Sequence, residues 1–274
     1  MIVLVTGGDR VDAGKTTFST GLLERTGAIG YKPRAANDYW FDHDDCLEAL
    51  ARGRLYGKDA AKLADMERAD RGPEALNPVH RLWQPATTGS AGILGRPDRE
   101  FIVDRVVRPD SEDPLYVRNG TVDVPDVVEE SLPLEESLTV ESLEELNELM
   151  QREYLPAFRS LTSEIASAEL AVVESYGNVA RPLESLDEEL VSAVAVVEPG
   201  SARIYRGSRF SRACAVAGSS PGGGTLETRV PDVTGSIEPV ARVSLPPLAA
   251  EQRNDPEAIA DAYESAYSAL LETI

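Results

Sequence analysis

Cysteine, histidine and lysine are all scarce in this sequence of 274 residues. Its two cysteines, Cys46 and Cys214, lie far apart and lack C-x-x-C spacing, so neither a disulfide framework nor a zinc site is expected. The two histidines, His43 and His80, cannot build a His-based metal site by themselves. No apolar run approaches membrane-spanning length and no segment resembles a signal peptide. We therefore expect a cytoplasmic protein that does not associate with membranes.

Positive charge is scarce as well. The chain has 27 basic against 47 acidic residues, a formal net charge of −20 and a pI near 4.5. These values argue against a nucleic-acid partner, because phosphate backbones require a basic surface. Only Lys15, Lys32, Lys58 and Lys62 are lysines, and the other basic residues are arginines. This composition resembles that of proteins from salt-loving archaea, in which salt screens the repulsion among surface carboxylates.

Glycine and lysine are concentrated near the start of the chain, in V-T-G-G-D-R-V-D-A-G-K-T-T, residues 5 to 17. The preceding apolar run I-V-L-V predicts a buried parallel strand, and Phe18, Leu22 and Leu23 at helical spacing predict a helix. A glycine-rich turn between a strand and a helix directs backbone N–H groups at an anion, and Lys15 adds a positive charge. The stretch therefore predicts a phosphate-binding loop. The alternative is a chance G-K-T after a strand.

The match to the P-loop template G-x-x-x-x-G-K-[ST] is close but incomplete. Gly14, Lys15 and Thr16 fit, whereas the first glycine of the template falls on Asp9 and Gly8 lies one residue upstream. In that template the lysine contacts the β- and γ-phosphates and the hydroxyl binds Mg²⁺. A nucleotide with Mg²⁺ is therefore expected at this loop.

Apolar segments of strand and helix type alternate along the rest of the chain, which predicts an α/β fold with a doubly wound, mostly parallel sheet. Further strands are expected at 28–33, 170–174, 191–197 and 240–245, a hairpin at 101–107 and 115–124, and helices at 46–70, 142–169, 203–216 and 256–274. Pro156 either interrupts the helix at 142–169 or starts a new one. With no repeat and no linker, residues 1–274 are expected to form one domain, with an insertion or lid at about 95–140.

Polar clusters follow three of the expected strands. They are the glycine-rich loop, Lys32 with the acidic string at 37–45, and Glu174. Ligands of open α/β sheets bind beyond the carboxyl ends of the strands, so these clusters are expected to converge. Within the string, Asp38, Asp42, Asp44 and Asp45 could form a multi-carboxylate metal site or remain solvated surface residues. At most one of Asp42, Asp44 and Asp45 is expected to be a metal ligand.

The same segments resemble dethiobiotin synthetase and its relatives, a branch of P-loop proteins that also contains Min-type and cobyrinic-acid-amidating ATPases. The loop with Gly8, Gly14, Lys15 and Thr16 is similar to the elongated P-loop of that family. Gly30-Tyr31-Lys32-Pro33 is similar to its G-Y-K-P segment, Asp45-Cys46-Leu47 to its S-D-A-L segment, Val172-Val173-Glu174 to its V-E-G-A-G-G strand end, and Asn77-Pro78 with Pro85 to its N-P…P element. The resemblance covers residues 1 to about 90 and 165 to about 250.

The resemblance implies a P-loop NTPase fold and a set of site residues. Thr16, Asp45 and Glu174 would hold Mg²⁺. Lys15 and Lys32 would be catalytic, Lys15 by neutralising charge on the transferred phosphoryl group and Lys32 by orienting an anionic substrate or its carboxylated intermediate. Residues expected to bind the nucleotide are Gly8, Asp12, Ala13, Gly14, Lys15, Thr16, Thr17, Asp232 and Pro246.

Two departures from the family pattern concern the substrate. Tyr176 stands where the family has a small residue, and Val11 aligns with its substrate-contacting threonine. Arg10 takes the place where the Min-type branch has a second lysine that reaches across a dimer, although a solvent-facing loop residue is an equal alternative.

The leading functional expectation is an ATP- and Mg²⁺-dependent enzyme that phosphorylates a carboxylate or carbamate for ligation or ring closure. Its substrate would be a small molecule, anionic or an amine, and the protein is expected to be a homodimer. The alternatives are a Min-type dimeric ATPase switch or chaperone that acts on a protein or metal-cofactor partner, and a small-molecule kinase.

Overall fold

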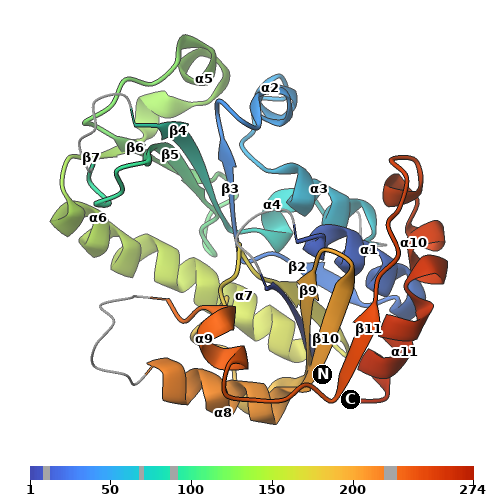
Figure 1. Ribbon diagram of the computed structural model, residues 1–274. Coiled ribbons are helices and arrows are strands. Elements are labelled where there is room, and N and C mark those ends of the chain that lie inside the picture. Colours follow the sequence, from blue (N-terminus) through green and yellow to red (C-terminus); the bar gives the residue numbers. More distant parts are fainter. Residues whose placement is uncertain (9–12, 68–70, 87–91, 219–226) are drawn as a thin grey trace. The chain divides into compact units, whose positions relative to one another are not determined.

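The chain folds into two compact units, each built around its own mixed sheet. The computed structural model describes residues 1–8, 13–67, 71–86, 92–218 and 227–274 (Figure 1). Unit 1 comprises Met1–Pro33, Lys62–Asp70 and Thr162–Ile274, and unit 2 comprises Arg34–Ala61 and Arg71–Leu161. The expected insertion at about 95–140 lies inside unit 2, and the assignment of one domain to the whole chain stays a prediction.

Unit 1 contains a six-stranded sheet in the order β11-β10-β9-β1-β8-β2. Strands β9, β1, β8 and β2 are parallel, and β10 is antiparallel to both of its neighbours. The strands are β1 (Ile2–Gly7), β2 (Ile29–Tyr31), β8 (Ala171–Glu174), β9 (Val191–Glu198), β10 (Ser201–Arg206) and β11 (Ala241–Ser244). The central strands are buried on both sides, as the continuous apolar runs of β1 and β9 predicted.

Helices cover both faces of this sheet, which makes unit 1 compatible with a doubly wound α/β fold. Figure 1 shows α1 (Lys15–Thr26), α10 (Pro256–Ala262) and α11 (Glu264–Leu271) on one side, and α8 (Gly207–Gly218) on the other. Helices α1 and α11 are joined by a hydrogen bond from the Tyr267 hydroxyl to the Phe18 carbonyl oxygen (3.0 Å). Unit 1 also contains α9 (Val230–Thr234), the 3₁₀ turns Glu188–Leu190 and Gln252–Asn254, and the ends of two further helices at 62–65 and 162–167.

Unit 2 contains a five-stranded sheet in the order β3-β4-β5-β6-β7. The expected hairpin is confirmed as the antiparallel pair β5 and β6, and β3 and β7 add parallel strands at the two edges. The strands are β3 (Arg34–Asp38), β4 (Val79–Pro85), β5 (Arg99–Val106), β6 (Leu115–Asn119) and β7 (Leu138–Val140). The helices are α2 (His43–Leu50), α4 (Pro73–Leu76), α5 (Asp126–Ser131), α6 (Leu143–Leu149), a 3₁₀ turn at Leu134–Glu136 and a π-helical turn at Met150–Tyr154.

Three of the expected helices differ from the observed elements. The helix predicted at 46–70 is two helices, α2 and α3 (Lys58–Asp65), because the chain between them turns at Gly53 with φ of 68°. The helix predicted at 203–216 begins only at Gly207, so the prediction is wrong for Arg203–Arg206, which belong to β10. The terminal helix is likewise divided, with Tyr263 between α10 and α11. By contrast, the helical segment at 142–169 is confirmed, and Pro156 stands in the first turn of α7 (Leu155–Ser167).

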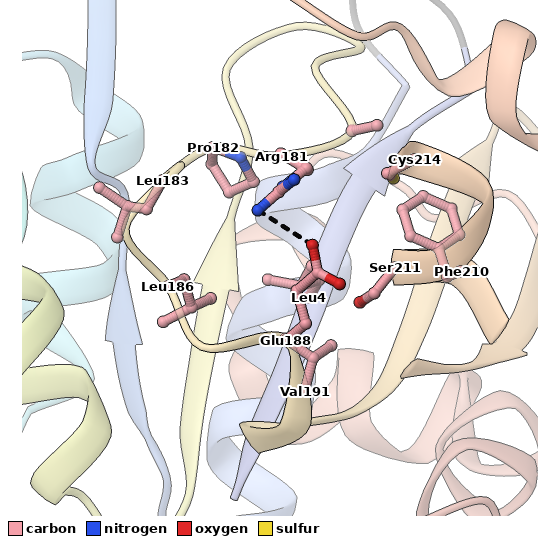
Figure 2. A pocket seen from close by; sticks show the side chains of 11 residues that line it. Leu4, Arg181, Pro182, Leu183, Leu186, Glu188, Val191, Phe210, Ser211 and Cys214 are labelled. Carbon is pink, nitrogen blue, oxygen red and sulfur yellow. Dashed lines mark ion pairs between the residues drawn. The ribbon is translucent and has the colours of Figure 1, made fainter. Parts of the chain in front are cut away.

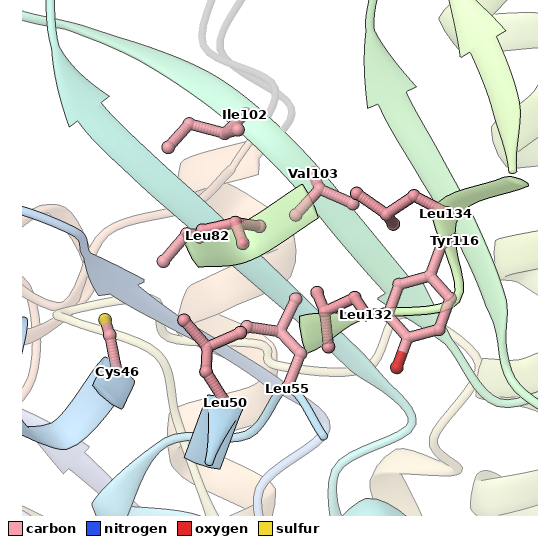
Figure 3. Close-up of a cluster of buried hydrophobic side chains, with 10 residues drawn as sticks. Cys46, Leu50, Leu55, Leu82, Ile102, Val103, Tyr116, Leu132 and Leu134 are labelled. Atoms are coloured by element: carbon pink, nitrogen blue, oxygen red, sulfur yellow. The ribbon is translucent and has the colours of Figure 1, made fainter. Parts of the chain in front are cut away.

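A hydrophobic cluster fills unit 2 between one face of its sheet and the helices α2 and α5 (Figure 3). Leu82, Ile102 and Val103 come from the central strands, and each is fully buried. The other members are Cys46, Leu50, Leu55, Tyr116, Val128, Leu132 and Leu134. Unit 2 therefore has a core of its own, as expected for a compact folding unit.

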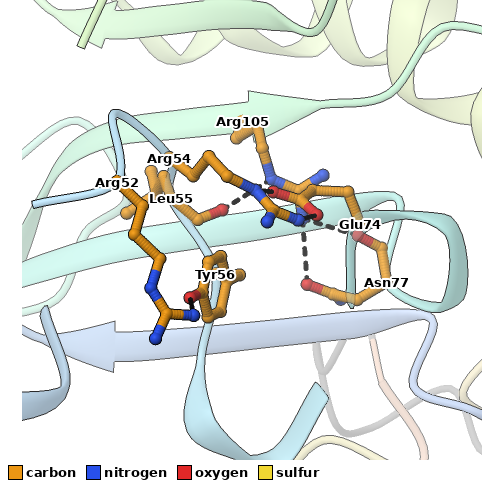
Figure 4. Close-up of polar contacts among 7 residues, drawn as sticks. All are labelled: Arg52, Arg54, Leu55, Tyr56, Glu74, Asn77 and Arg105. Carbon is orange, nitrogen blue, oxygen red and sulfur yellow. Dashed lines mark hydrogen bonds and ion pairs between the residues drawn. The ribbon is translucent and has the colours of Figure 1, made fainter. Parts of the chain in front are cut away.

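Unit 2 also buries an arginine completely (Figure 4). The Arg105 guanidinium donates to the Leu55 carbonyl oxygen (2.7 Å), the Asn77 carbonyl oxygen (2.6 Å) and the Asn77 side-chain oxygen (3.1 Å). Burial lowers the pKa of Arg105 to about 10, so it remains charged at neutral pH. Close by, Arg54 forms an ion pair with Glu74. The Asn77-Pro78 element thus has a structural role, because its asparagine ties β5 to the segment before β4.

Candidate functional site

The glycine-rich stretch connects β1 to α1, as the sequence predicted. Gly14 caps α1 with a left-handed backbone (φ 80°, ψ 16°), which favours glycine, and Lys15 begins the helix. The first turn of α1 contributes no acidic residue of its own to the positive end of the helix dipole. Among the expected nucleotide ligands, Gly8, Ala13, Gly14, Lys15, Thr16 and Thr17 lie at this junction. Asp12, with Asp9, Arg10 and Val11, lies outside the described residues.

Three of the predicted site residues meet at the carboxyl end of β8. The Thr16 hydroxyl donates to Glu174 Oε1 over 2.8 Å, and the Lys32 ammonium donates to the same oxygen over 2.5 Å. Strand register accounts for the meeting, because Val5 pairs with Glu174 and Tyr31 pairs with Val173. Residues just beyond the ends of β1 and β2 therefore lie level with the end of β8.

The Glu174 carboxylate is unusual in its burial. The residue is fully buried (0% exposed), and Lys32 is only 4% exposed. Glu174 Oε2 is buried and has no hydrogen-bond partner in the described part of the chain. Since buried polar atoms nearly always have a partner, such an oxygen points to a water molecule or a cation as its missing neighbour.

The oxygen ligands at this position fit a magnesium ion. The Thr16 hydroxyl and the Glu174 carboxylate are hard oxygen donors, which Mg²⁺ prefers. Within the described ranges, no group of three or more His, Cys, Asp or Glu side chains could hold a metal. Mg²⁺ bound together with a nucleotide usually takes its other ligands from phosphate oxygens and water.

Two buried hydroxyl groups hold the chain on both sides of Glu174. The Ser175 hydroxyl donates to Thr6 Oγ1 (2.9 Å), and the Thr6 hydroxyl donates to the Val179 carbonyl oxygen (3.0 Å). The Ser175 amide donates to the Val5 carbonyl oxygen (2.9 Å), which continues the β1–β8 pairing past the carboxylate. These positioning residues were missed by the sequence reasoning. The only available signal was a polar residue directly after each apolar run.

The predicted metal ligand Asp45 lies on α2 in unit 2. There it forms an ion pair with Lys58 (2.8 Å), and this hydrogen bond raises the pKa of Lys58. Asp42 accepts a hydrogen bond from the Asp38 amide, and Asp38 accepts one from the Trp40 amide. The acidic string therefore stabilises the turn before α2, and in the part of the chain that the structure describes it forms no group of three or more side chains that could hold a metal ion. The assignment of Asp45 to the magnesium ion stays a prediction.

The two residues expected near the nucleotide base lie at different places in unit 1. Pro246 is exposed and follows β11, where the neighbouring Leu245 amide donates to the Gly200 carbonyl oxygen (2.9 Å). Because β11 runs parallel to β9, Pro246 lies at the same sheet edge as Gly8. Asp232 is exposed on α9, just after the point where the Val230 amide donates to the Asn178 carbonyl oxygen. Contacts of both residues with a nucleotide stay a prediction.

Glu198 at the end of β9 packs against the start of the glycine-rich stretch. A Cβ atom added to Gly8 would lie 2.2 Å from Glu198 Oε1, so glycine is required while Glu198 keeps this position. Arg203 holds Glu198 there through an ion pair of 2.8 Å across the β9–β10 hairpin. The Gly8 amide donates to the Val197 carbonyl oxygen (2.9 Å). Gly8, which lies one residue upstream of the template's first glycine, is thus in close contact with Glu198 where the loop begins.

A small cavity of about 20 Å³ lies elsewhere in unit 1, beside β1 and α8 (Figure 2). Arg181 and Glu188 line it and form an ion pair of 3.1 Å. The other lining residues are Leu4, Ala180, Pro182, Leu183, Leu186, Val191, Phe210, Ser211 and Cys214. A volume of this size holds a water molecule and no more, so this cavity is not a substrate or cofactor site.

Neither the protein-family models nor the curated proteins gave a match to this chain. Among the described helices, none combines the length and the apolar character needed to cross a membrane.

Proposed function

We propose that unit 1 binds ATP with Mg²⁺ at the junction of β1 and α1 and phosphorylates a small substrate, in the manner of dethiobiotin synthetase-like P-loop enzymes. The observation that carries this proposal is the meeting of Thr16 and Lys32 on a fully buried Glu174 whose second carboxylate oxygen lacks a partner. Hydroxyl, ammonium and carboxylate groups beside a glycine-capped helix start are the groups that a nucleotide phosphate and its metal ion require.

Each residue at this position has a distinct role in the proposal. Lys15 and the backbone N–H groups of the first turn of α1 bind the phosphates. Thr16 and Glu174 hold the magnesium ion, which supplies neutralisation of charge on the phosphate oxygens. Ser175 and Thr6 fix the backbone on either side, so that the Glu174 carboxylate keeps its position.

Lys32 selects the substrate in this proposal. Its ammonium lies 2.5 Å from Glu174, so an anionic group bound by Lys32 would be next to the metal site. A carboxylate or carbamate oxygen in that position can attack the γ-phosphorus, with cleavage of the bond to the bridging oxygen and release of ADP. An amine that then attacks the acyl phosphate would release inorganic phosphate and complete a ligation or ring closure.

The test compares substitutions at the lysines, of which the chain has only four. We expect Lys15→Ala to abolish ATP binding, and Lys32→Ala to retain ATP binding while losing substrate-stimulated turnover. Lys62→Ala is the matched control, because the Lys62 ammonium donates to the Asn254 side-chain oxygen at the surface (3.1 Å), and neither residue belongs to the proposed site. Wild-type ATP affinity in Lys15→Ala would contradict the phosphate assignment.

The substrate class is tested by turnover in concentrated salt with small acids, amines and bicarbonate. Stimulation by an amine with bicarbonate supports the ligase. If no small acid or amine stimulates turnover, while ATP promotes dimerisation, the protein is instead a dimeric ATPase switch of the Min type.

A further inference from the structure

Three arginines surround one buried tryptophan in unit 2. The guanidinium carbons of Arg81, Arg99 and Arg96 lie 5.1, 5.4 and 5.7 Å from the centroid of the Trp83 ring. Such contacts between cations and an aromatic ring are attractive, and arginine is the residue that most often makes them. We refer to Arg81, Arg96, Arg99 and Trp83 as the arginine cluster.

One member of the cluster is held rigidly. Arg81 donates two hydrogen bonds to Asp104, of 2.6 and 2.5 Å, and its guanidinium also lies over the Phe101 ring at 4.7 Å. Asp104 is fully buried and accepts a third hydrogen bond, of 2.6 Å, from the Tyr154 hydroxyl. Tyr154 belongs to the π-helical turn between α6 and α7. Arg81 is therefore fixed in place before any ligand binds, which lowers the entropy cost of binding.

The positive charge of the cluster exceeds the negative charge paired with it. Asp104 is paired with Arg81, and Asp98 is paired with Arg99 at 3.0 Å. Within the described residues, Arg96 has no ion pair. The Asp98 side chain is 58% exposed, so water screens its charge. In a chain of net charge −20, this local excess of positive charge is an exception that needs an explanation.

Trp83 has a hydrogen-bond donor without a partner. The residue is 6% exposed, and its indole N–H is buried and has no acceptor in the described part of the chain. A buried donor without an acceptor costs about 1–3 kcal/mol. A ligand oxygen that reached this N–H would supply the missing acceptor. The side chains of Arg81 and Arg99 are partly open to solvent, with exposed fractions of 18% and 33%.

We propose that the arginine cluster is a binding site for a small oxyanion, a carboxylate or phosphate group, distinct from the site at Glu174. Arginine forks bind the paired oxygens of either group by charge-assisted hydrogen bonds. The fixed Arg81 positions the anion, and Arg96 supplies a charge that has no ion pair among the described residues. Arg99, whose partner Asp98 is largely exposed, adds a further guanidinium group.

Anion binding at this site can be followed by tryptophan fluorescence. It has two tryptophans, and Trp40 is 74% exposed in the turn after β3, so Trp40→Phe leaves Trp83 as the only tryptophan. We would titrate the Trp40→Phe variant with inorganic phosphate and, separately, with malonate, at constant ionic strength in concentrated KCl. Arg96→Gln and Arg99→Gln are made in the same background. The matched control is Arg152→Gln, an exposed arginine of unit 2 whose ion pair within the described ranges is with its neighbour Glu153.

We expect a saturable change in Trp83 emission with at least one of the two anions, and the one that binds more tightly identifies the ligand group. Each substitution in the cluster should weaken binding by about tenfold or more, because it removes a charge-assisted contact, whereas Arg152→Gln should leave it unchanged. A response without saturation for both anions would overturn the proposal. So would saturation that neither Arg96→Gln nor Arg99→Gln changes, since phosphate bound at the glycine-rich loop would behave in that way.

Discussion

Removing the charge of Lys32 tests the electrostatics of the site around Glu174 most simply. We propose the substitution Lys32→Met, which keeps the length of the buried side chain and removes its ammonium. Glu174, fully buried, then retains the Thr16 hydroxyl as its donor but loses its positively charged partner. The expected result is a large loss of stability, because a buried charge without a counter-charge is costly.

The magnitude follows from the geometry of the pair. At the N–O distance of 2.5 Å, Coulomb's law with an effective dielectric constant near 20 gives an attraction of about 7 kcal/mol. Part of that attraction is offset in the native protein, because burying the lysine charge is itself costly. Substitutions that remove one partner of a buried pair usually cost about 3–5 kcal/mol, and we expect Lys32→Met to fall in that range.

The measurement is the free energy of unfolding from urea titration in concentrated KCl, for the single variants and for Lys32→Met with Glu174→Gln. The double variant removes both charges, so it should cost about 1–3 kcal/mol, the penalty of buried polar groups without partners. A cost of less than ~1 kcal/mol for Lys32→Met alone would refute the reasoning. Additive costs in the double variant would refute it as well, since two groups in contact should be coupled.

Three further predictions concern other parts of the chain. Burial, together with nearby carboxylates for Cys46, raises the pKa of Cys46 and of Cys214 to about 12, so a thiol reagent at pH 8 should label neither in the native protein and both in urea. Rapid labelling of the native protein would contradict the burial. Because the thiol of an unfolded chain has a pKa of about 8.5, the free energy of unfolding should also fall as the pH rises from about 8.5 towards 12. Tyr154→Phe removes the hydroxyl donor to the buried Asp104 and should cost about 1.5–3 kcal/mol in urea titration, whereas a cost within error of zero would show that the bond contributes nothing. Gly207→Ala would place a Cβ atom 1.8 Å from a backbone carbonyl oxygen of β9, so α8 must shift, and we expect a loss of at least ~2 kcal/mol; an unchanged unfolding midpoint would disprove the close approach.

The parts of unit 1 that the sequence predicted well are those with strong local signals. Ile2–Gly7 and Val191–Glu198 are continuous apolar runs, and both are buried parallel strands. Glu174 and Lys32 were expected to approach the glycine-rich loop because parallel strands end at one edge of the sheet, and their contact confirms that argument. The shared contact with Thr16 was likewise predictable from strand order.

Other features were placed wrongly or depend on contacts that the local sequence does not encode. The chain from Arg203 to Arg206 was expected to begin a helix, but it becomes β10, which pairs with β9 and β11 on either side. Ile204 and Tyr205 favour a strand, so the local propensity agrees with the observed element and the helix boundary was placed too early. The contact of Glu198 with Gly8 and the complete burial of Arg105 join segments distant in the sequence.

The acidic string shows a different limit of sequence reasoning. In so acidic a chain, carboxylates that stabilise a turn cannot be distinguished from metal ligands by composition. Asp38 and Asp42 accept backbone hydrogen bonds, and Asp45 pairs with one of the few lysines. Their hydrogen-bond partners are evident only once the turn before α2 is described.

The most direct test of the central claim is the affinity for ATP, measured by calorimetry with Mg²⁺ and with a chelator, for the wild type and for Glu174→Gln. If Glu174 and Thr16 hold the magnesium ion of a bound nucleotide, the wild type binds ATP more tightly with Mg²⁺. Glu174→Gln should lose that difference and keep the affinity measured in chelator. An unchanged Mg²⁺ dependence in Glu174→Gln, or no ATP binding by the wild type, would contradict the account.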